Sequence, residues 1–131
     1  MPLLAYAEPY RSGNNKTYTS KENNCIHVGK NVDLNYVEQY RVDGQVFPKG
    51  SKPNRCDFLL LNADKRTAYY IELKGTSIPD SIQQLETSVA MLRGRHPQCD
   101  TIFTALFIIR GVTKQILAQR FAGRKRSALT G

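Results

Sequence analysis

Three charged side chains lie in two otherwise apolar stretches of the sequence. Asp57 is the second residue of CDFLLLN, and Glu72 and Lys74 lie near the end of TAYYIELKG. Two neighbouring carboxylates offer the hard oxygen ligands that bind Mg²⁺ or Mn²⁺. A divalent cation held in this way makes water nucleophilic near neutral pH and stabilises charge that develops on phosphate. These residue types therefore support metal-dependent phosphodiester hydrolysis, with Lys74 orienting the attacking water and offsetting phosphate charge.

The spacing of these residues predicts that their side chains converge. The stretches CDFLLLN and TAYYIEL favour strands, and the polar ADKR between them is short enough for a hairpin. A two-residue turn and a four-residue loop give the same register, in which Asp57 lies opposite Glu72. Because side chains alternate along a strand, Lys74 shares the face of Glu72, and opposed Cβ atoms lie about 5 Å apart. Carboxylates so close repel each other, which favours a cation between them.

A structural explanation of the same residues has to be weighed against a catalytic one. Asp57 could cap a strand, and Glu72 with Lys74 could form an ion pair on the exposed face of a half-buried sheet. The neighbouring strands are apolar at their centres, which is typical of strands buried on both faces. Charges in such surroundings favour a functional site.

The elements that must position these residues follow from periodicity and turn residues. We expect loops in the first third of the chain, with one short helix at residues 19–25, and then a strand at 36–42. Residues 78–95 are predicted to form an amphipathic helix, and the apolar run at 101–111 a strand buried on both faces. A final helix is predicted at 113–126. The apolar stripe of the helix at 78–95 is expected to comprise Ile78, Ile82, Leu85, Val89 and Leu92.

The stretch CDFLLLNADKRTAYYIELKG resembles the core signature of the PD-(D/E)xK nuclease superfamily, with an aspartate opening one strand and Glu-x-Lys late in the next. The helix containing IQQLE is similar to the one that follows this motif in archaeal Holliday-junction resolvases. The resemblance implies an α/β fold with a restriction-endonuclease-like core, in which helices flank a central mixed β-sheet in the order α-β-β-β-α-β. We expect one such domain over residues 1–131.

The resemblance also implies roles for individual residues. Asp57 and Glu72 match the metal ligands of the superfamily, and Lys74 matches its catalytic lysine. Gln84, within IQQLE, matches a glutamine that often lies near the site, although a solvated helix face explains it equally well. The implied cofactor is Mg²⁺ or Mn²⁺.

Two features depart from the superfamily pattern. Cys56 stands where a proline usually precedes the aspartate, a change that leaves the ligand in place. A clear first helix with an acidic residue is also missing. Glu22 is the nearest candidate for a third metal ligand, and Glu38 is the next.

The charge of the chain is uneven. Of the net charge of +8, the part after Glu86 contributes +7, because it holds eight Lys or Arg residues against Asp100 alone. A basic face of this kind is expected of a protein that binds nucleic acid, while a solvated tail explains the segment 123–131 equally well. The predicted nucleic-acid-binding residues are Arg110, Lys114, Arg120, Arg124, Lys125 and Arg126.

Composition narrows the class of protein. No apolar run approaches the roughly 18 residues of a membrane span, and the three cysteines lack the spacing of a disulfide framework or zinc site. We therefore expect a cytoplasmic protein that does not bind membranes. The combined prediction is a Mg²⁺-dependent endonuclease acting on DNA, with RNA also open, and working as a homodimer because one small site cuts one strand. The alternative is a nucleic-acid-binding or protein-interaction module that retains the fold without turnover.

Overall fold

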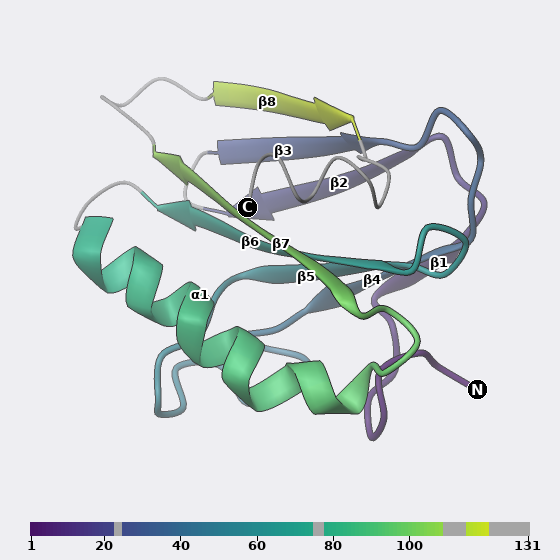
Figure 1. The fold of residues 1–131 in the computed structure, drawn as a ribbon. Helices are drawn as coiled ribbons and strands as arrows, with labels where there is room; N and C mark the ends of the chain where they lie inside the picture. Colours follow the sequence, from purple (N-terminus) through teal and green to yellow (C-terminus); the bar gives the residue numbers. More distant parts are fainter. Residues whose placement is uncertain (23–24, 75–77, 109–114, 121–131) are drawn as a thin grey trace.

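The structure, a computed structural model, describes residues 1–22, 25–74, 78–108 and 115–120, and at 74, 108 and 115–120 it describes the backbone only. This part of the chain contains two β-sheets and one α-helix, α1 (Ile78–Leu92), which a 3₁₀ turn (Arg93–Arg95) extends. Helix α1 crosses one face of the larger sheet, and the smaller sheet lies on the other side (Figure 1). The protein therefore has a mixed α/β fold.

The larger sheet has five strands, and both kinds of strand pairing occur in it. In spatial order the strands are β1 (Arg11–Gly13), β4 (Val37–Arg41), β5 (Phe58–Asn62), β6 (Thr67–Lys74) and β7 (Thr101–Ile108). Strands β6 and β7 are parallel, whereas the other neighbours are antiparallel. Parallel neighbours require a crossover connection, and α1 lies in that connection.

The smaller sheet has three described strands and uses segments from both ends of the sequence. In spatial order they are β2 (Thr17–Glu22), β3 (Cys25–Lys30) and β8 (Gln115–Arg120). Strands β2 and β3 form an antiparallel pair, and β8 joins the other edge of β3 in parallel.

Strand β5 is buried on both faces because the larger sheet lies between two hydrophobic clusters. On the side of α1, Leu59 and Leu61 pack in one cluster with Leu85 and Leu92 of the helix. On the other side, alternate residues of β5 and β6 pack against Tyr18 and Cys25 of the smaller sheet. The alternation of strand side chains thus gives the sheet a helix-facing side and a sheet-facing side.

The predicted hairpin and its register are confirmed. Phe58 pairs with Ile71 and Asn62 pairs with Thr67, so the connection is the four-residue loop 63–66. One step beyond the first pair, the amide of Asp57 donates a hydrogen bond to the carbonyl of Ile71 at 3.1 Å. Asp57 therefore reaches the level of Glu72, as the symmetric register requires.

The short helix predicted at 19–25 is wrong where the structure describes it, because residues 19–22 lie in β2 and Cys25 begins β3. The burial of β2 alternates, with Tyr18 and Ser20 buried between exposed neighbours. The alternation of TYTSKE and the β-branched CIHV were the signals of a hairpin that the prediction missed.

The helix predicted at 113–126 is also wrong where the structure describes it, since 115–120 form β8. The sequence QILAQR is rich in good helix formers, so local propensity favoured a helix. Strand β3 offers a row of backbone donors and acceptors along its free edge, and pairing with it overrides that preference. Residues 113, 114 and 121–126 of the predicted helix lie outside the described residues.

The middle of the chain follows the predicted order β-β-β-α-β, from β4 to β7. The first helix of the predicted α-β-β-β-α-β order is replaced by strands, so that order is wrong at its start. Strand β7 is partly exposed rather than buried on both faces, because it is the last described strand of its sheet. Among the described residues, no helix has the length and apolar character needed to cross a membrane.

Helix α1 begins where predicted, but its buried face is turned from the expected stripe. Leu85 and Leu92 are buried as predicted, whereas the side chains of Ile78 and Ile82 are each 47% exposed. Three of the five buried residues of the helix are serine or glutamine rather than aliphatic. The buried residues of α1 are Ser81, Gln84, Leu85, Ser88 and Leu92.

Candidate active site at the Asp57 and Glu72 pair

Asp57 is held in place by hydrogen bonds to the strands on both sides of it. Its carboxylate Oδ2 accepts a bond from the amide of Leu73 at 2.8 Å. Its backbone amide donates to Ile71, also in β6, and its carbonyl accepts from the amide of Val42 at 2.9 Å. The carboxylate at the start of β5 is therefore fixed against the neighbouring strand.

Glu72 lies two residues before the end of β6, the strand between β5 and β7. Its side chain is 1% exposed, and in the register of β6 with β7 it pairs with Leu106. By the alternation of β6 it shares the helix-facing side with Tyr70, which packs in the cluster against α1. Lys74 follows two residues later at the end of β6, where only its backbone is described.

Asp57 and Glu72 line one pocket of about 160 Å³, together with Gln84 of α1. The structure thus brings together three of the residues that the sequence singled out. Asn54 and Gln84 also line a neighbouring pocket of about 260 Å³ along α1. The other described residues of the smaller pocket come from the segment between β4 and β5: Asp43, Gly50, Ser51, Asn54 and Arg55.

Helix α1 is tied directly to the backbone that carries Asp57. The hydroxyl of Ser88 accepts a hydrogen bond from the amide of Cys56 at 2.8 Å and donates one to the carbonyl of Gln84 at 2.7 Å. A proline at position 56 would have no amide to satisfy, so Ser88 supplies the partner that cysteine requires here. This link holds Gln84, which is 9% exposed, beside the carboxylates.

The carboxylates make the described lining of the pocket electronegative. Asp43, Asp57 and Glu72 contribute three acidic groups, and Arg55 is the one basic group among the described lining residues. Burial, with a further contribution from Glu72 and Asp57, raises the pKa of the Cys56 thiol to about 12. Burial and the nearby Asp57 also raise the pKa of Cys25. A cation is therefore favoured in this pocket.

The donor set fits a hard divalent cation that keeps several outer ligands. Asp57 and Glu72 present carboxylate oxygens, and Gln84 adds an amide. The described residues contain no group of three or more His, Cys, Asp or Glu side chains that could hold a metal ion. A Mg²⁺ ion commonly binds through one or two carboxylates, with water and substrate phosphate completing its coordination.

Neither candidate for a third carboxylate lies among the described residues of this pocket. Glu22 ends β2, and its carboxylate lies 3.8 Å from the guanidinium of Arg41. Glu38 is buried in β4, where it accepts hydrogen bonds from the amide of Leu3 and the hydroxyls of Tyr36 and Tyr40. Glu38 thus fastens the N-terminal segment to the larger sheet.

Asp43 and Arg55 are the charged residues of this pocket that the sequence analysis did not single out. Arg55 is the basic one. It is only 6% exposed, and its guanidinium carbon lies 3.9 Å from the ring centre of Phe47. Nothing in the sequence VFPKGSKPN, which precedes Arg55, indicates that this segment lines the pocket with the carboxylates. The nearness of Arg55 to Asp57 in the sequence was the available signal.

Only one of the six predicted nucleic-acid-binding residues falls within the described part of the chain. Arg120 ends β8, with its backbone alone described. The other five, Arg110, Lys114, Arg124, Lys125 and Arg126, lie outside the described residues.

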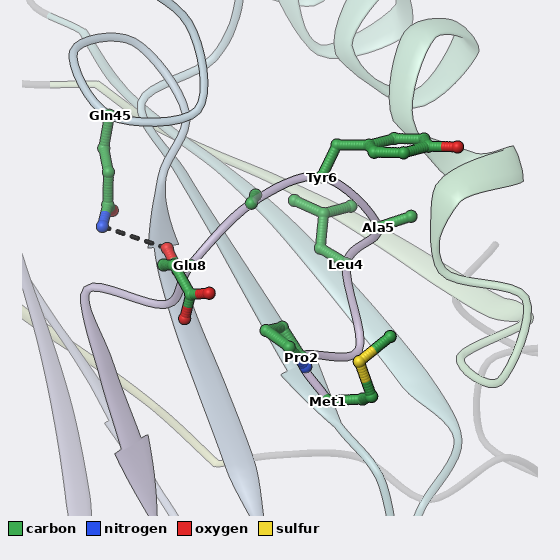
Figure 2. A pocket seen from close by; sticks show the side chains of 8 residues that line it. Met1, Pro2, Leu4, Ala5, Tyr6, Glu8 and Gln45 are labelled. Atoms are coloured by element: carbon green, nitrogen blue, oxygen red, sulfur yellow. Dashed lines mark hydrogen bonds between the residues drawn. The ribbon is translucent and has the colours of Figure 1, made fainter.

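A larger cavity of about 610 Å³ is lined by the N-terminal segment and Gln45 (Figure 2), and neither Asp57 nor Glu72 is among its described lining residues. Gln45 bounds it and donates a hydrogen bond to the carbonyl of Glu8 at 3.1 Å. Glu8 provides the one carboxylate of its described lining. This cavity therefore lacks, among the described residues, the paired acidic groups that a two-carboxylate metal site needs.

Comparison with known proteins assigns no function to this chain, so the proposed function is based on the residues described above. No family model matches the chain, and searches of curated proteins and of solved structures found no significant match.

Proposed function

We propose that this protein is a Mg²⁺- or Mn²⁺-dependent endonuclease of the PD-(D/E)xK type that hydrolyses phosphodiester bonds of DNA. The observation that supports this most directly is the shared pocket of Asp57, Glu72 and Gln84. Two carboxylates from adjacent strands, one of them almost fully buried, are costly to keep together without a cation.

In the proposed mechanism, Asp57 and Glu72 hold the cation. When bound, such an ion supplies hydroxide near neutral pH and neutralises charge on phosphate. The amide of Leu73 orients the carboxylate of Asp57 by donating a hydrogen bond to its Oδ2 atom. Lys74 orients the water and Gln84 contacts the phosphate; the role of Lys74 follows from its Glu-x-Lys spacing.

The order of elements around the site agrees with the proposal. Strands β4, β5 and β6, then α1 and β7, follow the order that the superfamily resemblance implies for its core. The two carboxylates are on β6 and at the start of β5, and α1 packs over them. We therefore propose that this part of the chain is a restriction-endonuclease-like core.

DNA is the proposed substrate because of the basic last third of the chain. Such a segment binds the phosphate backbone largely without regard to sequence. Branched DNA is included because the helix with IQQLE is similar to that of junction resolvases. We propose a homodimer, since cutting both strands of a duplex requires two sites of this size.

The proposal is tested by incubating the protein with supercoiled plasmid, single-stranded DNA, a four-way junction and RNA, first in Mg²⁺ and then in EDTA. We expect Mg²⁺-dependent cleavage of at least one DNA. Linear plasmid formed without an accumulated nicked form would indicate paired sites. Binding without cleavage of any substrate in Mg²⁺ or Mn²⁺ would refute the enzyme and favour a binding module.

Variants separate this site from a contaminating nuclease. Glu72→Gln and Asp57→Asn should each lose roughly 100-fold or more of the cleavage rate, because each removes a charged metal ligand. Binding of DNA in Ca²⁺ should persist. Asp33→Asn is a matched control, because Asp33 is an exposed carboxylate paired with Lys65 at 3.1 Å, outside the pocket. Either ligand variant cutting as fast as this control would reject the assigned site.

A further inference from the structure

Arg55 is the one basic residue among the described lining of the carboxylate pocket, and it is 6% exposed. It precedes Asp57 by two residues and lines the same pocket as Asp57 and Glu72. The ring of Phe47 covers one face of its guanidinium. One terminal nitrogen, Nη2, donates to the hydroxyl and carbonyl of Ser51. The plane of the guanidinium is therefore held on two sides.

The Nε atom of Arg55 is buried, and no described residue accepts a hydrogen bond from it. Arg55 also forms no ion pair with any described carboxylate. A buried guanidinium with an unused donor is costly even where carboxylates line the same pocket, and such a cost is usually offset by an acceptor on a ligand or partner. The unused donor of Arg55 thus indicates an acceptor that comes from outside the described chain.

Phosphate is the acceptor that suits this donor. Guanidinium groups bind phosphate oxygens through parallel hydrogen bonds in a fixed plane, and stacking on an aromatic ring fixes that plane in advance. Because the described carboxylates of the pocket outnumber its described cation, these side chains by themselves would repel an anion. A divalent cation on Asp57 and Glu72 removes that repulsion and brings the phosphate within reach of both.

We propose that Arg55 is a substrate-binding residue that holds a phosphate oxygen of the DNA beside the carboxylate pair, an inference that rests on the proposed function. Phe47 and Ser51 act as positioning residues for its guanidinium. DNA binding should therefore depend on both the metal and Arg55. Without the metal, the phosphate would lie beside uncompensated carboxylates. Without Arg55, it would lack a directed hydrogen-bond donor.

The experiment measures the affinity of a labelled DNA duplex in Ca²⁺, across a salt series, for the wild type, Arg55→Gln and Arg55→Lys. Arg66→Gln is the matched control, because Arg66 is half-exposed in the loop 63–66 and pairs with Asp100 at 3.4 Å. Arg55→Gln should weaken binding roughly 10- to 100-fold, as expected when a charged hydrogen bond is removed. Its slope of log K against log salt should flatten by about 0.9. The Arg66→Gln protein should match the wild type in both quantities.

Arg55→Lys keeps the charge without the planar group, so it should retain the wild-type salt slope and bind more weakly. Circular dichroism checks that each variant is folded. If Arg55→Gln does not fold, the lysine variant decides, because wild-type affinity in that protein would overturn the inference. Equal affinities for Arg55→Gln and Arg66→Gln would overturn it as well.

Failure of this inference can be told from failure of the proposed function. If the wild type cuts DNA and Arg55→Gln cuts it with unchanged kcat and KM, the phosphate role of Arg55 is refuted while the nuclease stands. If no nucleic acid is cut but Arg55→Gln still loses metal-dependent DNA binding, the phosphate site stands and the nuclease is refuted.

Discussion

Asp57 permits a test that separates its charge from its hydrogen bond. Asparagine at this position keeps an oxygen that can accept from the amide of Leu73, now bonded to Oδ2 at 2.8 Å. Alanine removes both the charge and the acceptor. The two variants therefore share the loss of a metal ligand but differ in what happens to a buried backbone donor.

The expected magnitudes follow from these contacts. Asp57→Ala leaves the Leu73 amide without its acceptor, which should lower the free energy of unfolding by roughly 1–3 kcal/mol. Asp57→Asn keeps the bond and removes repulsion from Glu72, so the unfolding free energy without metal should rise slightly, by up to about 1 kcal/mol. Saturating Mg²⁺, at about 100 times its dissociation constant, should stabilise the wild type by about 2.7 kcal/mol and neither variant.

Urea unfolding followed by circular dichroism, in EDTA and in Mg²⁺, measures all of these quantities without relying on catalysis. A drop in stability of Asp57→Asn equal to that of Asp57→Ala would mean that the charge serves a structural contact. Equal stabilisation by Mg²⁺ of the wild type and Asp57→Asn would show that the ion binds elsewhere.

Three further predictions concern the surroundings of the site. His96 accepts a hydrogen bond from Tyr70 through Nε2 and donates to the carbonyl of Cys99 through Nδ1, and burial lowers its pKa from 6.5. As the pH falls, His96 is therefore protonated in the unfolded chain before it is protonated in the folded protein. The unfolding free energy should be unaffected by His96 above about pH 6.5 and should fall below it by up to about 1.4 kcal/mol per pH unit. Urea titrations in which the wild type and His96→Gln have the same pH dependence would contradict this. Ser88→Ala should cost roughly 1–3 kcal/mol of unfolding free energy, because the buried amide of Cys56 loses its acceptor, whereas Thr87→Ala, its neighbour in α1, should cost less in the same urea assay. Replacing Arg120, Arg124, Lys125 and Arg126 with Gln should weaken binding to different duplex sequences equally and flatten the salt slope by about 0.9 for each phosphate that these side chains neutralise; an unchanged slope would indicate that these residues form a solvated tail.

The parts of the fold that could be predicted are those set by neighbouring residues. The pairing of Asp57 with Glu72 required only alternation and a short polar connection, and both strands lie next to each other in the chain. The ends of helix α1 could also be predicted, because residues that favour a helix start and a helix end flank it in the sequence. The rotation of its buried face could not be predicted, because Ser81 and Ser88 are buried although serine adds nothing to a hydrophobic pattern.

The missed parts depend on contacts between distant segments. The sequence of β8 favours a helix by itself and becomes a strand through β3, which lies in the first third of the chain. Arg55 enters the pocket because the segment before it folds back so that Phe47 meets its guanidinium. Patterns within a single sequence do not show which distant segments come into contact. They indicated the carboxylate pair but not the residue that we propose binds the phosphate.

The parallel pairing of β3 with β8 also has a consequence for folding during synthesis. Cys25 pairs with Gln115, so the ribosome must reach residues 115–120 before β3 acquires its second neighbour. Until then one edge of the β2–β3 pair presents free amides and carbonyls, which can pair with another chain. Closing so long a loop is slow compared with forming the adjacent hairpins. The nascent protein is therefore most prone to aggregate in the interval before β8 docks, when its other strands have already been made.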